Sequence, residues 1–332
     1  MPARVIEDLG ESYRVHDGSR ELLAEASGRL RYEAASREDL PVAGDWVLIR
    51  PRPEGDRAVL VRVLARRTRL SRKAAGKEST AQVLAANVDT VLVVQGLDRD
   101  FNPRRLERYL VAVREGGAQP AVVLNKSDVC PEAALRAAEM ERIVGGVRVH
   151  VISALQGRRM DSVACYLGLG RTVALVGSSG VGKSTLVNRI AGAEIQRVRT
   201  AREADGRGRH TTTSRRLVML DGGGLLLDTP GMRELAPWDA GAGLDEAFSD
   251  IEDLAGSCRF RDCSHGVEPG CAVRAALDDG TLDRARFASH EKLLREARHT
   301  AMKHDAALRC QETLRWKRIH LEMRRAHKKN GM

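Results

Sequence analysis

Residues 177–185 read Gly177-Ser178-Ser179-Gly180-Val181-Gly182-Lys183-Ser184-Thr185, which matches the phosphate-loop pattern G-x-x-x-x-G-K-[ST]. The glycines let the backbone turn so that its N–H groups face nucleotide phosphates, and the helix that follows adds the positive end of its dipole. Lys183 is expected at the β- and γ-phosphates, and the Ser184 hydroxyl on Mg²⁺. An apolar strand at 172–176 precedes the loop and a helix is predicted from about Lys183, which is the context that this pattern requires.

A second nucleotide motif lies upstream of this loop. The tetrapeptide Asn125-Lys126-Ser127-Asp128 follows an apolar strand at 121–124 and matches the N-K-x-D motif that resembles the guanine-specificity motif of GTPases. The Asp128 carboxylate offers acceptors to the N1–H and the exocyclic amino group of guanine. Adenine has neither donor at that edge and would leave the carboxylate unpaired. Asn125 is expected at the opposite edge of the base, with the Lys126 stem packed on the ring.

A third, looser segment completes the base-binding region. Ser153-Ala154 directly follows an apolar strand at 147–152 and resembles the second base-contacting loop of GTPases. In ordinary GTPases the base motif follows the phosphate loop, whereas here it precedes the phosphate loop. Such a rearrangement is possible when the original termini lie close together, because a short loop can join them without changing the core.

The sequence therefore predicts a circularly permuted P-loop GTPase on a mostly parallel α/β sheet. The expected strands lie at 88–95, 121–124, 147–152, 172–176, 217–220 and 225–227, and the expected helices at 102–115, at 131–144 and from Lys183.

Two segments after the phosphate loop fit the nucleotide-sensing switches. Asp228-Thr229-Pro230-Gly231 resembles the D-x-x-G of switch II, where Asp228 would hold the Mg²⁺ shell and the Gly231 N–H would sense the γ-phosphate. The polar, glycine-rich stretch 206–213 fits switch I, which becomes ordered around the γ-phosphate and Mg²⁺. One of its threonines is expected to bind Mg²⁺: Thr212 is preferred, with Thr211 and Thr213 as alternatives.

Met232 stands where many GTPases carry the glutamine that orients the attacking water. A thioether cannot take this role, so the sequence predicts slow intrinsic hydrolysis that a partner accelerates. His210 is the candidate replacement, because imidazole can accept or position a proton near pH 7. A contact between His210 and an RNA phosphate is the alternative.

A candidate metal site follows the switches. Cys258, Cys263, His265 and Cys271 form the pattern C-x4-C-x-H-x5-C. Three thiolates and one imidazole, with no open position, suit a closed tetrahedral structural Zn²⁺ site. Buried free cysteines are the alternative. The three remaining cysteines are isolated in the sequence and are expected as small core or surface residues: Cys130, Cys165 and Cys310.

The first 70 residues predict a small all-β domain. Short apolar stretches at 11–15, 30–32, 45–50 and 58–64 are separated by turn formers such as Asp17-Gly18. Short strands in this space suit a five-stranded barrel of the OB type, although an SH3-like barrel would give almost the same pattern. The expected domains are an OB-fold RNA-binding domain at 1–70, the permuted GTPase domain at 71–240 and a mostly helical zinc-binding domain with a basic C-terminal helix at 241–332.

The composition favours a soluble, cytoplasmic protein. Hydrophobic residues make up 42% of the chain and charged residues 30%, which is ordinary for a globular protein. No apolar run approaches the ~18–20 residues that span a bilayer, and the first residues lack the apolar stretch of a signal peptide. We therefore expect a monomer without membrane attachment, whose cysteines stay reduced or bind metal.

The net charge of +10 is unevenly distributed. Residues 284–332 hold fourteen Lys and Arg against five Asp and Glu. A basic tail of this kind predicts binding to nucleic acid, with an anionic membrane or a solvated helix face as alternatives. The tail lacks the Trp, Phe and Leu stripe of a membrane-surface helix, which disfavours the membrane.

Together these motifs resemble one family, the circularly permuted, ribosome small subunit-dependent GTPase A. The likeness covers nearly the whole chain. Besides the nucleotide motifs, it is carried by residues 42–47, 87–89, 208–213, 258–265 and 268–271.

The resemblance implies an OB-fold, a GTPase domain and a zinc domain, with one structural Zn²⁺ and with Mg²⁺ bound alongside GTP. It also implies late maturation of the small ribosomal subunit, binding to its rRNA, and ribosome-stimulated hydrolysis of GTP to GDP and phosphate. An RNA-binding assembly factor that uses GTP only as an affinity switch is the alternative. The barrel offers only Tyr13, Tyr32 and Trp46 for stacking, with Trp46 expected in the core, so recognition of RNA backbone and shape is favoured.

Overall fold

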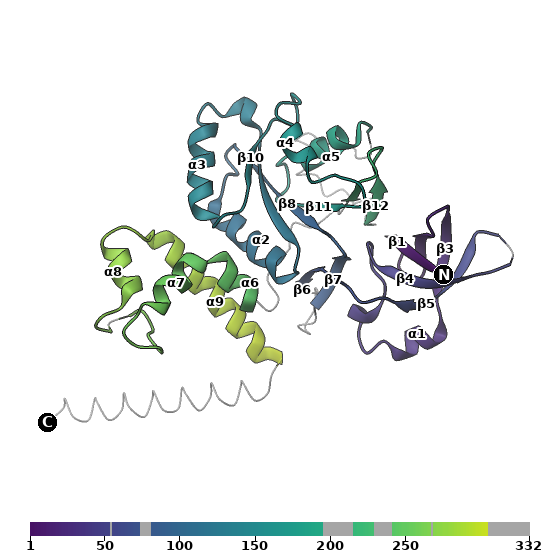
Figure 1. Ribbon diagram of the computed structural model, residues 1–332, viewed down its shortest axis with the longest axis horizontal. Helices are drawn as coiled ribbons and strands as arrows, with labels where there is room; N and C mark the ends of the chain where they lie inside the picture. Colours follow the sequence, from purple (N-terminus) through teal and green to yellow (C-terminus); the bar gives the residue numbers. More distant parts are fainter. Residues whose placement is uncertain (54, 74–80, 195–214, 229–240, 267, 305–332) are drawn as a thin grey trace, which may run out of the picture.

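The computed structural model describes residues 1–53, 55–73, 81–194, 215–228, 241–266 and 268–304 (Figure 1). Three parts follow one another along the chain. An α/β sheet lies between a β-barrel at one end of the molecule and a group of helices at the other (Figure 1). The nucleotide motifs belong to the sheet, and the cysteine cluster belongs to the helical part.

The N-terminal part is a closed five-stranded barrel. Its strands are β1 (Pro2–Asp8), β2 (Tyr13–His16), β3 (Glu21–Ala26), β4 (Trp46–Pro51) and β5 (Arg57–Val63). They pair in the order β1-β2-β3-β5-β4, and β4 pairs back to β1. The β3–β5 pair is parallel, and helix α1 (Gly28–Glu33) connects β3 to β4. This closure confirms the prediction of an OB-type barrel.

Two expectations for the barrel are wrong. The strand predicted at 30–32 is part of α1, because Ser27 caps that helix by accepting the Leu30 N–H at 3.1 Å. Trp46 is not in the core but is 42% exposed. Its neighbour Val47 points inward, and successive strand residues face opposite sides. The Arg4 guanidinium lies 5.3 Å from the centre of the Trp46 ring.

The central sheet has five parallel strands and one antiparallel strand. The order is β10 (Val149–Val151), β9 (Gln119–Asn125), β8 (Thr90–Gly96), β11 (Thr172–Val176), β13 (Leu225–Asp228) and the antiparallel β12 (Arg216–Met219). β8 and β11 are buried along their whole length, as expected for parallel strands with helices on both faces. The prediction of a mostly parallel α/β sheet is confirmed.

Helices cover both faces of this sheet. α2 (Pro103–Glu115) and α3 (Ala133–Ile143) pack on one face, and α4 (Asp161–Ala164) and α5 (Lys183–Ala191) pack on the other. α2 begins as its sequence predicts, with the Asn102 side chain accepting the Arg105 N–H at 3.1 Å and Pro103 in the first turn.

The barrel and the central sheet are joined at several points. β1 pairs with β12 through Glu7 and Arg216, so the two sheets are continuous. Arg4 is buried and donates to Thr172 Oγ1 at 2.8 Å and to the Asn87 carbonyl at 3.1 Å. Asn87, which has a left-handed φ of 55°, donates to the Gly44 carbonyl at 3.1 Å. A hairpin of β6 (Arg69–Lys73) and β7 (Ala81–Ala86) lies between the two parts.

The C-terminal part is helical and packs on α2. It contains α6 (Gly241–Ala247), α7 (Ser249–Gly256), α8 (Ala272–Asp278) and α9 (Arg284–His304). α6 approaches α2 so closely that a Cβ at Gly243 would lie 2.7 Å from the Val111 carbonyl oxygen and from the Glu115 amide nitrogen. A helix interface of this kind fixes the helical part beside the sheet (Figure 1). Among the described residues, no helix is long and apolar enough to cross a membrane.

Candidate nucleotide site and metal centre

The phosphate loop connects β11 to α5, as its pattern predicts. Gly177, Gly180 and Gly182 have positive φ angles of 148°, 78° and 92°. A Cβ at Gly177 would lie 2.2 Å from the Val94 carbonyl oxygen, and a Cβ at Gly182 would lie 2.4 Å from the Asn125 side-chain nitrogen. Two of the three glycines are therefore required both by their backbone conformation and by close neighbours.

The lysine of this loop is folded over its own backbone. Lys183 Nζ donates to the carbonyl oxygens of Gly177 at 2.9 Å and Ser178 at 2.6 Å. Ser178 Oγ in turn donates to Asp100, which pairs with Arg105 at 2.7 Å. The remaining side chains of the motif are placed as follows: Ser179 is exposed, Val181 is buried, and Ser184 and Thr185 are half-buried in the first turn of α5.

The base motif meets the phosphate loop through one amide. Asn125 ends β9 and is buried. Its Nδ2 donates to the Val181 carbonyl at 2.9 Å, and its Oδ1 accepts the Ala154 N–H at 2.9 Å. Three segments that are distant in sequence therefore meet at a single side chain. They lie at the C-terminal edge of the parallel strands, where open α/β sheets bind their ligands.

The rest of the base motif is held from two sides. Ser153 Oγ donates to Asp128 Oδ1 at 2.5 Å. Lys126 has a left-handed φ of 67°, and its Nζ lies 2.5 Å from Asp98 Oδ2. Burial alone would raise the pKa of Asp98, but the hydrogen bond and the charge of Lys126 outweigh it and lower that pKa below its usual value. Ser127 donates its N–H to the Ile152 carbonyl at 3.1 Å.

Two acidic residues of this site lie outside the predicted motifs. Asp98 contacts the base motif and Asp100 contacts the phosphate loop. Both lie in the loop after β8, two and four residues beyond its last residue, at the same sheet edge as the motifs. Two acidic residues after a continuous apolar strand could have indicated this placement, because open α/β sheets bind ligands at the carboxyl ends of their strands.

The switch residues are only partly described. Asp228 ends β13, beside the strand that enters the phosphate loop, and its main chain pairs with Arg216 of β12. The following predicted residues lie outside the described parts of the chain: His210, Thr211, Thr212, Thr213 and Gly231.

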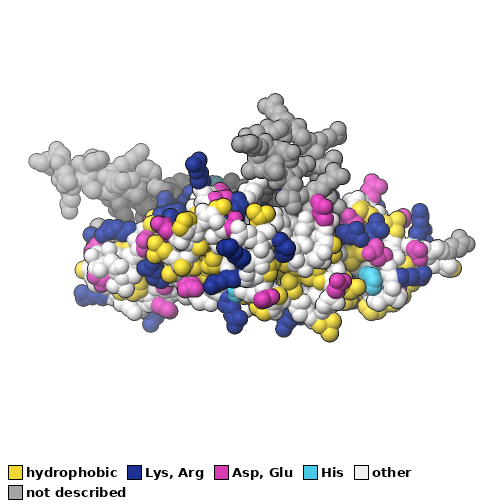
Figure 2. Space-filling model, turned by 90° about the horizontal axis from the view of Figure 1, so that it is seen from above, with side chains coloured by type: hydrophobic (Ala, Val, Ile, Leu, Met, Phe, Trp, Pro, Cys, Tyr) yellow, Lys and Arg dark blue, Asp and Glu magenta, His cyan; other side chains and the backbone are white. Residues whose placement is uncertain are grey.

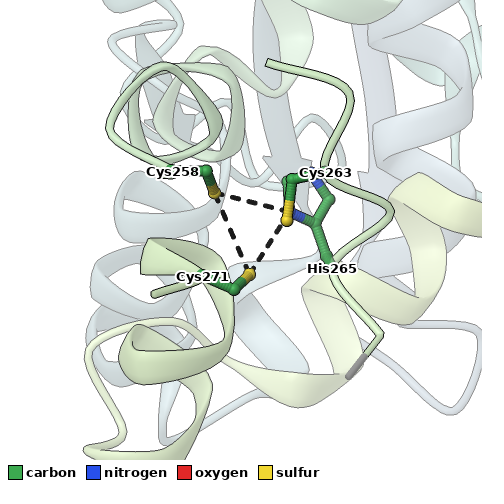
Figure 3. A group of neighbouring side chains, drawn as sticks. All are labelled: Cys258, Cys263, His265 and Cys271. Atoms are coloured by element: carbon green, nitrogen blue, oxygen red, sulfur yellow. Dashed lines mark hydrogen bonds between the residues drawn. The ribbon is translucent and has the colours of Figure 1, made fainter. Parts of the chain in front are cut away.

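The predicted cysteine cluster is assembled in space (Figure 3). The ligand atoms of Cys258, Cys263, His265 and Cys271 all lie within 4.8 Å of one another. Cys258 Sγ is 3.9 Å from Cys271 Sγ, and His265 Nδ1 is 3.5 Å from Cys271 Sγ and 3.7 Å from Cys258 Sγ. Zn–S bonds of about 2.3 Å place two sulfurs of a tetrahedral site ~3.8 Å apart. The side chains present therefore fit a four-coordinate metal ion.

Neighbouring backbone holds the cluster together. Cys271 caps α8, and its Sγ accepts the Arg274 N–H at 3.4 Å. His265 has a left-handed φ of 60° in the segment between Cys263 and Cys271. Burial opposes ionisation of the Cys258 thiol, but the backbone N–H groups of Val273 and Ala272 outweigh it and lower the pKa of that thiol. The other two described cysteines are separate from the cluster: Cys130 is half-buried and Cys165 is exposed.

Comparison with known proteins identifies the family. A family model described as RsgA GTPase matches residues 63–238. The chain belongs to the RsgA GTPase family. The resemblance expected from the motifs is confirmed, and with it the prediction that the chain is a GTP hydrolase.

Curated relatives of this RsgA GTPase match over nearly all of its length. A protein of Opitutus terrae is 48% identical over 340 residues, which cover 100% of this chain and 93% of the relative. A protein of Syntrophotalea carbinolica is 44% identical over 339 residues, with coverage of 100% and 93%. Both are named small ribosomal subunit biogenesis GTPase RsgA.

Solved structures share the fold of this RsgA GTPase. The crystal structure of YjeQ from Thermotoga maritima is 26% identical, has a TM-score of 0.66, and covers 89% of this chain and 98% of its own. The structure of YloQ, described as a circularly permuted GTPase, is also 26% identical, with a TM-score of 0.63 and coverage of 90% and 95%. The predicted permutation is thereby confirmed.

Proposed function

We propose that this RsgA GTPase binds GTP where the three loops meet, hydrolyses it, and acts in the biogenesis of the small ribosomal subunit. The Asn125 amide carries the proposal, because it joins the phosphate loop at Val181 to the second base loop at Ala154. A phosphate subsite and a base subsite held together in this way suit a single guanine nucleotide. The small ribosomal subunit is inferred from the names of the relatives that match the whole chain.

Within this site the base motif reads guanine. Asp128 accepts from the N1–H and the amino group of the base, Asn125 addresses its opposite edge, and the Lys126 stem packs on the ring. Lys183 leaves the carbonyls of Gly177 and Ser178 for the phosphates. The full proposed GTP-binding set is Asn125, Lys126, Ser127, Asp128, Ser153, Ala154, Gly177, Ser178, Ser179, Gly180, Val181, Gly182, Lys183, Ser184 and Thr185.

The proposed Mg²⁺ ligands are Ser184 and Thr212, with Asp228 holding the shell of the ion. The ion would neutralise charge that develops on the β- and γ-phosphates. The Gly231 N–H senses the γ-phosphate. His210 positions the attacking water or, as the alternative, contacts an RNA phosphate. Because Met232 replaces the usual glutamine, we expect an unstimulated kcat below ~1 s⁻¹.

The metal at the cysteine cluster is proposed to be one structural Zn²⁺. Three thiolates and one imidazole leave no position for a substrate. The sulfur–sulfur and sulfur–nitrogen separations support a tetrahedral ion, and a disulfide would need sulfurs only about 2 Å apart.

The proposed partner is the small subunit and its rRNA. On the face shown in Figure 2, the described Lys and Arg side chains are interspersed with Asp and Glu. We therefore assign RNA binding chiefly to the basic segment 284–332, of which 305–332 lies outside the described residues. The exposed Trp46 and Tyr32 add two rings on which bases could stack. Binding through the tail should weaken steeply with salt.

We propose a cytoplasmic monomer without membrane attachment, divided into domains at 1–70, 71–240 and 241–332. Sedimentation at micromolar concentration tests whether the protein is a monomer, and liposome flotation tests whether it binds membranes. A dimer, or protein that floats with vesicles, would contradict them.

The deciding experiment measures multiple-turnover GTP hydrolysis with small subunits, with large subunits and without ribosomes in parallel. We expect stimulation by small subunits alone, and its loss in Lys183→Ala. Stimulated turnover that survives in Lys183→Ala would show that the active site is elsewhere. Nucleotide-dependent binding to small subunits with negligible turnover would support the affinity-switch alternative, which the family does not favour.

A further inference from the structure

One arginine outside every nucleotide motif reaches the second base loop. Arg189 lies in the last turn of α5, the helix that begins at Lys183. Its Nη2 donates to the Leu155 carbonyl at 2.9 Å, and its Nε donates to the Ala154 carbonyl at 3.3 Å. The guanidinium thus holds two successive backbone carbonyls, which suits its fork of N–H groups.

The loop that Arg189 holds is a tight turn. Ser153 and Arg158 exchange backbone hydrogen bonds of 3.2 and 3.0 Å. Gly157 closes the turn with a left-handed φ of 69°, and a Cβ built there would lie 3.6 Å from the Arg189 Cζ. The turn therefore lies directly against the guanidinium, and its position depends on that of α5.

The opposite side of the same turn contacts the base motif. The Ala154 N–H donates to Asn125, and Ser153 Oγ donates to Asp128. Asn125 also donates to Val181 in the phosphate loop, from which α5 leads back to Arg189. These contacts form a closed circuit around the proposed nucleotide site.

We propose that Arg189 is a positioning residue for guanine selection, an inference that rests on the proposed function. It fixes the Ser153-Ala154 loop, and through that loop it orients the Asp128 carboxylate and the Asn125 amide. Asp128 gains its advantage for guanine by accepting two donors at once, so a rotation of its carboxylate that weakens the contact to the 2-amino group lowers the preference for guanine over a base without that group. Contacts to the phosphates are common to all nucleotides.

The test compares GDP with IDP, whose base lacks the 2-amino group. Dissociation constants for both are measured by calorimetry for the wild type, Arg189→Ala and Arg189→Lys, with thermal melting of each protein. Arg142→Ala is the matched control, because Arg142 also donates from Nε to a carbonyl, but to Ala138 of its own helix at 3.3 Å.

We expect Arg189→Ala to weaken GDP binding about tenfold and to lower the preference for GDP over IDP at least about threefold. Arg189→Lys should have an intermediate effect, because an ammonium cannot reproduce the fork, and Arg142→Ala should change neither quantity. A lower melting temperature with an unchanged GDP preference in Arg189→Ala would overturn the inference.

If Arg189→Ala does not fold, Arg189→Lys decides, and a wild-type GDP preference in that variant overturns the inference. A wild-type protein that binds GDP and IDP equally would contradict the proposed base contacts, and the role of Arg189 with them. If the wild type and the Arg189 variants all prefer GDP over IDP to the same extent, only the positioning role of Arg189 is contradicted, and the proposed function stands.

Discussion

The guanidinium of Arg286 in α9 lies 3.0 Å from the carboxylate of Glu107 in α2, and both side chains are buried. Arg286 also donates to Asp250 through Nε at 2.7 Å and through Nη2 at 2.6 Å, and it lies 4.7 Å from the centre of the Phe248 ring. Burial raises the pKa of Glu107. One arginine therefore attaches the C-terminal helices to the GTPase sheet.

Arg286→Ala removes the cation that pairs with both Glu107 and Asp250. We expect the free energy of unfolding to fall by about 3–5 kcal/mol, because removing one partner of a buried pair leaves uncompensated charge. Urea denaturation at pH 7 measures this. The control is Arg284→Ala, whose exposed pair with Asp278 should contribute within about 0.5 kcal/mol. A loss below about 1 kcal/mol for Arg286→Ala would contradict the prediction.

Alanine substitutions at two glycines of the phosphate loop distinguish the effect of backbone strain from that of steric overlap. Gly182→Ala places a Cβ 2.4 Å from the Asn125 side chain, whereas Gly180→Ala meets no atom within 4 Å. Both positions have positive φ, so each alanine costs about 1–2 kcal/mol of backbone strain. We expect Gly182→Ala to weaken GDP binding by a further factor of about ten relative to Gly180→Ala. Equal affinities would mean that the Asn125 contact is unimportant.

Asp128→Asn should change which base is bound. An amide replaces one acceptor by a donor, which leaves the guanine amino group without its partner and matches the C2 carbonyl of xanthine. We expect GDP affinity to fall at least about a hundredfold and XDP affinity to rise above it. Competition between the two nucleotides measures the change. Retained preference for GDP would show that Asp128 does not read the base.

From the cysteine cluster we expect about one zinc per chain in protein purified without chelator. Cys263→Ser should lose most of that zinc and lower the melting temperature, because α7, α8 and the loop between them pack around the site (Figure 3). Cys165→Ser is the control, since Cys165 is exposed and outside the cluster. Elemental analysis that finds no zinc in the wild type would remove the site.

His150 should make the fold sensitive to mild acid. Burial, followed by the charge of Arg148, lowers the pKa of His150, whose Nε2 lies 2.8 Å from the Tyr166 hydroxyl. Between its lowered pKa and the usual value of about 6.5, the unfolded chain binds more protons than the folded one. Stability therefore falls as the pH drops below about 6.5.

The variant His150→Phe should show a smaller fall in melting temperature between pH 7 and pH 5. Some fall should remain, because burial also lowers the pKa of His290. His299→Gln, which changes an exposed histidine, serves as the control. A pH dependence in His150→Phe identical to that of the wild type would contradict the assignment.

The sequence predicts which segments come together at the candidate nucleotide and metal sites, because the ligands of such sites impose fixed spacing and residue types. Gly177, Gly182 and Asn125 lie where their motifs require, and the cysteine pattern is assembled as a cluster. The barrel is predicted less well. A short apolar stretch such as 30–32 does not distinguish a strand from a capped helix, and the strand alternation that exposes Trp46 depends on its register.

Contacts made by single residues could not be predicted. Arg4, Arg189 and Arg286 each bridge segments distant in sequence, and no local pattern marks them among the other arginines. Asp98 and Asp100 could have been suspected from their position after a buried strand. Their partners depend on tertiary packing.

The pairing of β1 with β12 gives the molecule a mechanical property. A load applied to the barrel passes through hydrogen-bonded strands and the Arg4–Thr172 contact into the strands that carry the nucleotide loops. The barrel therefore cannot turn far against the central sheet unless these bonds break. A large assembly that binds the barrel would therefore also fix the orientation of the nucleotide-binding edge of the sheet.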